Sequence, residues 1–229
     1  MEVSGLSVAA AAGVGADAPG RAREYFNRLS SSWESGIAPG ARERGRELVF
    51  SLGIEPGSRV LDVGCGTGVL IPWLAEAVGR TGRLVALDIA EKMLEEARSL
   101  HRLLDLEFVW ADVADIPFPG GAFDEVICHN CFHLFSDGEA ALSEMGRVLG
   151  PGGRAAVSYA WDIREATRRG GDPDAPRGGA DALAGEAVAR ALSAAGFELL
   201  RLEEGSDRFL ARARKAGRLP RFTAPSGRC

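Results

Sequence analysis

Short apolar runs alternate with amphipathic stretches along most of the chain. Nearly continuous apolar character is expected of strands that are buried on both faces of a sheet. It occurs at residues 59–63, 83–88, 106–112, 123–129 and 154–160. Apolar positions repeat at helical spacing in the intervening residues 69–78, 91–104 and 138–149. This alternation of strands and helices predicts βαβ units that build a parallel sheet.

Elements at both ends extend this pattern. Residues 21–34 place Tyr25, Phe26, Leu29 and Trp33 on one side of a helix, which either packs on the core or caps a pocket. Near the C-terminus, a helix at 184–195 precedes the runs FELLRLE and DRFLARAR, which flank the turn EGS. Two such runs around a short turn predict a closing antiparallel hairpin.

The length of 229 residues suits a single domain. We expect this domain to span 21–214, with a helical cap (21–50), a core (55–160), a flexible loop (161–182) and a final helix and hairpin (183–214). Flexible tails are expected at 1–20 and 215–229. Within the loop, the Gly/Pro-rich stretch 168–181 is either plain disorder or a substrate lid.

Charge and hydropathy exclude several classes of protein. The net charge of −5 argues against a dedicated nucleic-acid binder, and no apolar run is long enough to cross a bilayer. The N-terminal residues lack the basic start and apolar centre of a signal peptide, so a cytoplasmic location with reduced cysteines is expected. Either a monomer or a homodimer, without nucleic-acid or membrane partners, fits this composition.

The glycine-rich stretch VLDVGCGTG (60–68) follows the first strand of the core. The first crossover of a parallel sheet is where open α/β proteins bind nucleotides. The dinucleotide fingerprint G-x-G-x-x-G is absent, because Val69 stands where its third glycine belongs, and no lysine-bearing phosphate loop occurs. Asp62 precedes the first glycine by two residues, where a carboxylate repels phosphate and attracts an ammonium group. The pattern therefore favours a phosphate-free, nucleoside-like ligand with a cationic end over a pyrophosphate.

Two further acids support this interpretation. Asp88 closes the second strand, where a carboxylate can accept both ribose hydroxyls; the alternative is a helix cap. Asp112 ends the third strand, within reach of an adenine, and could accept from its exocyclic amino group.

Four segments in this order and spacing resemble the motifs of class I S-adenosylmethionine-dependent methyltransferases, in the branch of ubiquinone/menaquinone-biosynthesis-type and other small-molecule enzymes. They are VLDVGCGTG, VALDIAEKMLEEAR, ADVADIPFPGGAFDEVIC and EMGRVLGPGGRAAVS, and they cover roughly residues 55 to 160. The resemblance implies a Rossmann-like α/β fold: a seven-stranded, mostly parallel sheet with helices on both faces and an antiparallel C-terminal hairpin. It also implies S-adenosylmethionine as the cofactor, S-adenosylhomocysteine as the product and a small-molecule methyl acceptor.

The resemblance assigns the cofactor-binding residues. Glycines 64, 66 and 68, with Cys65 in the same loop, would let the backbone approach the methionine part, and Asp62 would hold its amino group. Asp88 would bind the ribose. The adenine would lie beside Ile89 and Met93, Asp112 and Val113. The methionine end would be lined by Cys128, His129 and Asn130, and the segment from Tyr25 to Trp33 would cover the cofactor.

Two histidines and two cysteines share the stretch CHNCFHLF. His129 and His133 are candidate general bases facing the methyl group; the alternative is a pair of hydrogen-bonded loop histidines. His101 is expected to be structural or exposed. Cys128 and Cys131 form a C-x-x-C pair, which can indicate zinc, redox chemistry or a soft-ligand site. No second ligand pair accompanies it, so no metal site is predicted.

The leading hypothesis is a methyltransferase that positions an acceptor in line with the sulfur–methyl bond. A non-catalytic module that binds S-adenosylmethionine or S-adenosylhomocysteine is a second hypothesis. An NAD-dependent reductase is disfavoured by Val69 and by the absence of a Tyr-x-x-x-Lys pattern. A nucleic-acid substrate is disfavoured because no N/D-P-P-Y/F pattern is present to stack a flipped base.

Overall fold

The fold was analysed in a computed structural model, in which residues 18–160, 176, 185–205 and 208–216 are described. Most of both predicted tails, most of the predicted loop at 161–182 including the possible lid, and part of the hairpin turn lie outside these residues.

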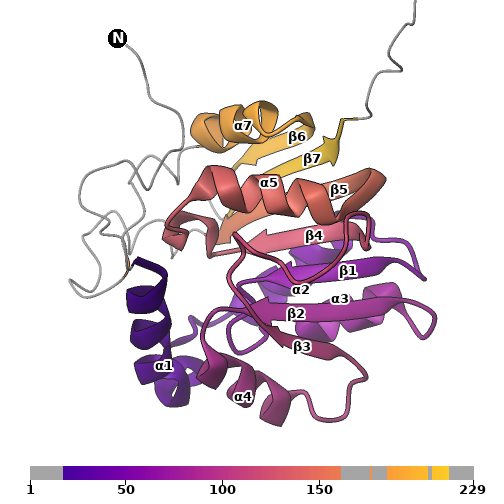
Figure 1. Ribbon diagram of the computed structural model, residues 1–229. Coiled ribbons are helices and arrows are strands. Elements are labelled where there is room, and N and C mark those ends of the chain that lie inside the picture. Colours follow the sequence, from indigo (N-terminus) through magenta and orange to yellow (C-terminus); the bar gives the residue numbers. More distant parts are fainter. Residues whose placement is uncertain (1–17, 161–175, 177–184, 206–207, 217–229) are drawn as a thin grey trace, which may run out of the picture.

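A single seven-stranded sheet runs through the described part of the chain (Figure 1), in the order β3-β2-β1-β4-β5-β7-β6. Its strands are β1 (Arg59–Val63), β2 (Arg83–Asp88), β3 (Glu107–Trp110), β4 (Phe123–His129), β5 (Leu149–Ala160), β6 (Phe197–Glu204) and β7 (Arg208–Lys215). Neighbours from β3 to β5 pair in parallel, and β7 is antiparallel to both β5 and β6. The predicted Rossmann-like α/β fold with an antiparallel C-terminal hairpin is therefore confirmed.

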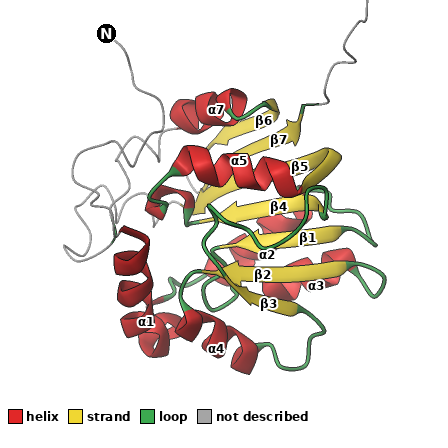
Figure 2. Ribbon diagram, in the orientation of Figure 1, coloured by secondary structure: helices red, strands yellow, loops and turns green. Residues whose placement is uncertain are grey.

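Helices cover both faces of the sheet (Figure 2). They are α1 (Ala18–Gly36), α2 (Ala41–Ser51), α3 (Ile71–Val78), α4 (Glu91–Leu100), α5 (Gly138–Val148) and α7 (Gly185–Ala194), with a short 3-10 turn at Phe132–Leu134. Side chains of α2, α3 and α4 belong to one buried cluster, and those of α5 and α7 belong to the cluster on the opposite face. Helix α1 lies at the carboxyl ends of β1 and β2, beside α4 (Figure 1).

Several element boundaries differ from the sequence-based expectation, among them those of two strands and one helix of the core. The third strand ends at Trp110, two residues before Asp112. The helix expected over 91–104 ends at Leu100. The fifth strand begins at Leu149, because Leu149 pairs with Phe123 and an irregularity then carries the glycine-rich segment 150–153 into the strand. Turn residues therefore lie inside this strand rather than before it.

A buried ion cluster links β4, β5 and β7 near the amino end of β4. Glu125 is 1 % exposed and forms ion pairs with Arg154 at 2.5 Å and with Arg212 at 2.8 Å. Arg212 also donates to the Leu52 carbonyl at 3.2 Å, directly after α2. We name Glu125, Arg154 and Arg212 the paired cluster. It joins three strands to the end of a helix, and its charges have opposite signs.

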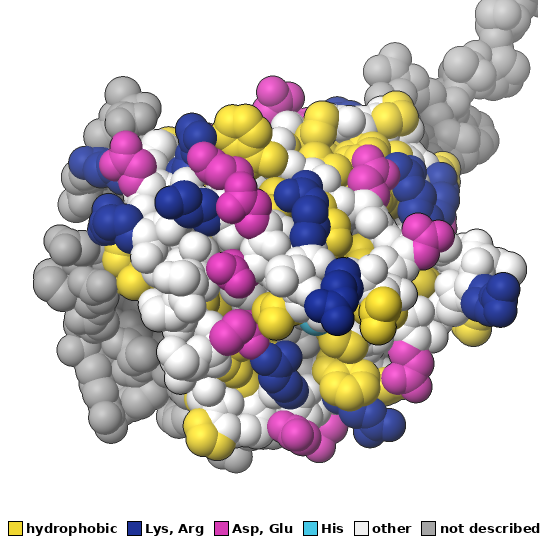
Figure 3. Space-filling view, turned by 90° about the horizontal axis from the view of Figure 1, so that it is seen from below, with side chains coloured by type: hydrophobic (Ala, Val, Ile, Leu, Met, Phe, Trp, Pro, Cys, Tyr) yellow, Lys and Arg dark blue, Asp and Glu magenta, His cyan; other side chains and the backbone are white. Residues whose placement is uncertain are grey.

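Basic and acidic side chains alternate on the face of the molecule seen in Figure 3, with hydrophobic side chains between them. Ion pairs between partly exposed side chains of the described residues include Arg83–Glu107 and Arg23–Glu91. Among the described residues, no helix has the length and hydropathy needed to cross a membrane.

Candidate cofactor and acceptor site

The glycine loop follows β1, where the sheet order reverses: β1 lies between β2 and β4. Gly64, Gly66 and Gly68 have φ of +65°, +56° and +92°, a region that side chains disfavour. A Cβ on Gly64 would lie 2.6 Å from Cys131 Sγ, and one on Gly68 would lie 2.6 Å from Ile71 Cδ1. On Gly66 it would meet only Trp33 Nε1, at 4.0 Å. Two of the glycines therefore serve packing within the protein, and Gly66 is the one that leaves space for a ligand.

Asp88, at the end of β2, is joined to the glycine loop. Its Oδ2 accepts from the Gly66 amide and its Oδ1 accepts from the Ala90 amide, each at 2.8 Å. Burial raises the pKa of Asp88, while these backbone donors lower it. The helix-cap role and a ribose-binding role are compatible, because each carboxylate oxygen keeps a second lone pair.

Asp62, on β1, is 2 % exposed. Burial, together with the charge of Asp88, raises the pKa of Asp62 to about 8. Within the described residues, the hydrogen bonds and ion pairs of the structure do not include its carboxylate. A buried carboxylate without a donor fits a ligand that brings its own cationic donor.

The remaining predicted cofactor residues lie around these two acids. Cys65 donates its backbone N–H to the Leu87 carbonyl at 3.1 Å, and burial raises the pKa of its thiol. Met93 is buried on α4, and the Ile89 carbonyl accepts from Trp110 Nε1 at 2.8 Å. Asp112 and Val113 follow β3. Asp112 Oδ1 accepts from the Ala114 amide at 2.9 Å, and Val113 is buried.

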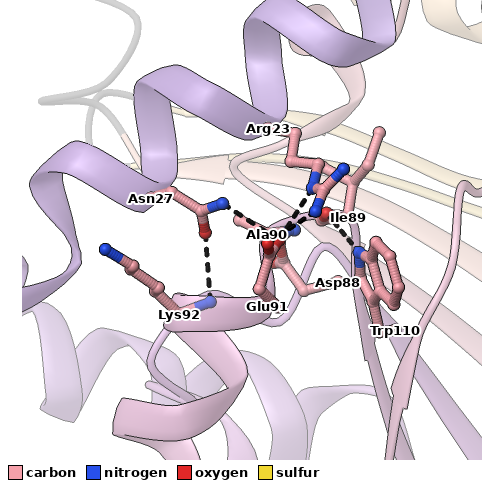
Figure 4. Close-up of polar contacts among 8 residues, drawn as sticks. All are labelled: Arg23, Asn27, Asp88, Ile89, Ala90, Glu91, Lys92 and Trp110. Atoms are coloured by element: carbon pink, nitrogen blue, oxygen red, sulfur yellow. Dashed lines mark hydrogen bonds and ion pairs between the residues drawn. The ribbon is translucent and has the colours of Figure 1, made fainter.

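Helix α1 is tethered to the start of α4 (Figure 4). Arg23 binds both carboxylate oxygens of Glu91, at 2.6 and 2.8 Å, and the Asn27 amide donates to the same carboxylate at 2.9 Å. Asn27 Oδ1 accepts from the Lys92 backbone amide at 3.0 Å. The Arg23 guanidinium also stacks 4.6 Å above the Trp110 ring. We name Arg23, Asn27 and Glu91 the α1 tether.

The other end of α1 reaches the glycine loop. Glu34 Oε1 accepts from the Thr67 hydroxyl at 2.5 Å, and Trp33 lies over Gly66. From the side of α4, His101 contacts the Thr67 carbonyl at 3.2 Å. Tyr25, the predicted covering residue, packs edge-to-face against Phe26 within α1. Helix α1 therefore spans from the glycine loop to the start of α4, beside the segment that carries Asp88.

The residues after β4 form a hydrogen-bonded array around His129. Asn130 has φ of +58°, the one positive value outside glycine among the described residues. Its Oδ1 accepts from the Ala160 amide at 2.8 Å, so its Nδ2 faces His129 Nε2 at 3.1 Å. Because Nδ2 only donates, Nε2 accepts and the ring proton lies on Nδ1, which donates to Ser158 Oγ at 2.9 Å. These two contacts therefore favour the His129 tautomer with its proton on Nδ1.

His133 lies in a different environment from His129. It is buried and packs edge-to-face on Tyr159, at 5.4 Å between ring centroids. Burial lowers the pKa of His133 to about 4, and its Nδ1 has no hydrogen-bond partner in the described part of the chain. It is therefore uncharged at neutral pH. The two candidate bases have different neighbours, and their catalytic roles remain predictions.

Cys128 and Cys131 flank His129 and Asn130 in the chain. Their sulfur atoms are 3.2 Å apart, and Cys131 Sγ donates to the Val63 carbonyl at 3.2 Å. The hydrogen bond with Cys128 and burial raise the pKa of the Cys131 thiol. In the described residues no group of three or more His, Cys, Asp or Glu side chains could hold a metal ion.

Sequence reasoning missed several residues that shape this site. The α1 tether, the Glu34–Thr67 hydrogen bond, and the contacts of His101 and Cys131 with the loop join segments 33 to 68 residues apart in the chain. No local pattern indicates such pairs. The sequence signal that could have suggested the tether is the opposite charge of Arg23 and Glu91 on two helices expected beside the same crevice.

Residues 60–153 match the family model of a methyltransferase domain. The ubiquinone/menaquinone biosynthesis C-methyltransferase UbiE of Ectopseudomonas mendocina (strain ymp) is 43 % identical over 111 residues, which cover 46 % of this chain and 43 % of the relative. UbiE of Vibrio vulnificus (strain YJ016) is 38 % identical over 109 residues, with 46 % and 42 % covered. The chain thus spans less than half the length of these curated relatives.

Solved structures share the fold over more of the chain. A SAM-dependent methyltransferase from Aquifex aeolicus superimposes with a TM-score of 0.67 at 24 % identity, covering 85 % of this chain and 98 % of that one. The [4+2]-cyclase SpnF superimposes with a TM-score of 0.60 at 22 % identity, covering 76 % and 80 %. At these identities the likeness shows the fold alone, and the cyclase illustrates that this fold hosts more than one chemistry.

Proposed function

We propose that the whole chain is an S-adenosylmethionine-dependent methyltransferase acting on a small molecule, because residues 60–153 match the family model of a methyltransferase domain. The observation that carries the proposal is the 2.8 Å hydrogen bond from the Gly66 amide to Asp88. This bond joins Gly66, the glycine with space beside it, to Asp88 at the end of β2. Ligands of open α/β sheets bind at this kind of switch point.

The residues of the crevice fit such a cofactor. Gly66 leaves space beside the loop, and Asp88 has lone pairs left for ribose hydroxyls. The buried carboxylate of Asp62 suits an ammonium group. Since a phosphate would meet two buried acids here, the site disfavours a pyrophosphate ligand.

S-adenosylmethionine supplies a methyl group that is already activated on a sulfonium. The chain would then orient the acceptor and exclude water, which can contribute many kcal/mol of effective concentration. The Nε2 atom of His129 accepts a hydrogen bond from Asn130, and His133 is buried. These contacts favour an acceptor that needs little help from a protein base. The names of the curated relatives support a small molecule, and a carbon acceptor in particular.

Calorimetric titration of the full chain with S-adenosylmethionine tests the cofactor. We expect Asp88→Ala to weaken binding by about ten- to a hundredfold, because a hydrogen bond to a charged group contributes about 1.5–3 kcal/mol. The control is Asp105→Ala, an exposed acid beyond α4. Unchanged affinity in a folded Asp88→Ala protein contradicts the proposed site.

Methyl transfer to a panel of small acceptors, quinone precursors among them, tests the activity. Tight binding without turnover on any acceptor would favour the second candidate, a non-catalytic module. The contacts of Glu34 and Trp33 with the glycine loop favour that candidate, because they place α1 over the proposed cofactor site.

A further inference from the structure

Two buried acids on adjacent strands have no ion-pair partner among the described residues. Asp62 on β1 and Asp88 on β2 belong to adjacent parallel strands, in which Asp62 pairs with Ala86. They are 2 % and 7 % exposed. We name Asp62 and Asp88 the acid pair.

In the part of the chain that the structure describes, no lysine or arginine forms an ion pair with either member of the acid pair. The ionisable side chains that face it are the thiols of Cys65, from the glycine loop, and Cys131, from the segment after β4. Further out, Glu34 from α1 and His101 from the end of α4 contact Thr67. Three arginines of this region have other partners: Arg23 binds Glu91, Arg42 binds Glu34, and Arg98, whose charge lowers the pKa of Cys65 slightly against the effect of burial, donates to the Phe108 carbonyl.

Two adjacent buried carboxylates cannot both be charged at low cost without a cation. Asp88 receives backbone donors on both oxygens, which stabilise its charged form. Asp62 receives none among the described residues, and its pKa is raised to about 8. A proton shared by the pair therefore lies on Asp62.

We propose that the acid pair carries one proton when the crevice is empty and releases it to solvent when a ligand with a cationic amino-acid end enters. This inference rests on the proposed function. The pair thus exchanges a proton for an ammonium group, and it selects S-adenosylmethionine or S-adenosylhomocysteine over nucleosides that lack the charged end. Asp62 is the residue that determines this specificity.

The exchange makes affinity depend on pH in one direction. Below the pKa of Asp62 the ligand must displace a proton, so affinity rises with pH by up to about tenfold per unit. The α-amino group of the ligand itself titrates near pH 8. The pH dependence that comes from Asp62 is therefore best measured between about pH 6 and 7.5.

Calorimetry of the full chain in buffers of low and high ionisation enthalpy counts the released protons. At about pH 6.5 we expect about one proton per S-adenosylmethionine bound. The control ligand, 5′-methylthioadenosine, lacks the amino-acid end and should release none. Asp62→Asn should abolish the release, whereas the exposed control Asp105→Asn should retain it.

A second measurement needs no variant. Infrared difference spectra of the wild-type chain should show the C=O stretch of a protonated carboxyl disappearing when S-adenosylmethionine is added. Binding without proton release, or equal release in Asp62→Asn, overturns this inference and leaves the proposed function intact. Absence of S-adenosylmethionine binding overturns the proposed function and this inference with it.

Discussion

The acid pair and the paired cluster are both groups of ionisable side chains on neighbouring strands, but only the paired cluster contains charges of both signs. In the paired cluster, Glu125 is 1 % exposed and lies between two arginines. In the acid pair, Asp62 is 2 % exposed and its charged neighbour has the same sign. Buried charges are normally paired, which suits a structural role for the paired cluster, whereas the acid pair is where we propose that the ligand binds.

Removing Glu125 should have the largest effect on stability. Glu125→Ala leaves the buried Arg212 without its carboxylate, which should cost about 3–5 kcal/mol of unfolding free energy in urea denaturation. Replacing the pair together, as Glu125→Leu with Arg212→Met, should recover most of that loss, because apolar side chains of similar volume are often as stable as a buried ion pair. A double variant as unstable as the single one contradicts a purely structural role.

The glycine loop above the acid pair offers the next largest effect. Gly64→Ala should cost several kcal/mol, because its Cβ would lie 2.6 Å from Cys131 Sγ at a φ of +65°. Gly66→Ala should cost only about 1–2 kcal/mol, the strain of the left-handed backbone. It should still weaken S-adenosylmethionine binding. Thermal unfolding measures the loss of stability in each variant, and calorimetry measures its affinity for S-adenosylmethionine. Equal destabilisation of the two variants would refute the assignment of Gly66 to the ligand.

Asp62→Asn should change how stability depends on pH. The pKa of Asp62 is about 3.9 in an unfolded chain and about 8 when folded. Between these values only the folded state keeps the proton, so the unfolding free energy of the wild type falls as pH rises, by at most about 1.4 kcal/mol per unit. The variant should lack this contribution in urea denaturation between about pH 6 and 8. Parallel pH profiles of the two proteins would contradict a protonated Asp62.

The α1 tether should give the smallest effect. Arg23→Ala removes two hydrogen bonds to Glu91 that are partly exposed to solvent, so stability should hardly change. Association of S-adenosylmethionine in stopped-flow measurements should become a few-fold faster, because α1 covers the crevice. Arg21→Ala, an exposed position on the same helix, is the matched control. Equal association rates would show that the tether does not limit entry.

Local patterns predicted the strands of the sheet and the position of the glycine loop. They also predicted the closing hairpin, and the resemblance added that the sheet has seven strands. The apolar run 59–63 and the acid Asp88 lie where the sequence indicated, because strand burial and strand ends leave local signals. The role of Gly64 and Gly68 was less predictable: their neighbours, Cys131 and His101, come from distant segments. The paired cluster was not foreseen for the same reason, since Glu125 and Arg212 meet only once β7 has joined the sheet.

Cys131 connects the glycine loop with the segment that follows β4. Its thiol donates to the Val63 carbonyl at the end of β1 and fills the space that a side chain on Gly64 would need. A displacement of the loop that carries the cofactor would therefore push on the segment that carries His129 and Asn130. We therefore expect the two loops to keep a fixed relative position, so that the protein interior sets the distance between the proposed cofactor and acceptor sites before either ligand binds.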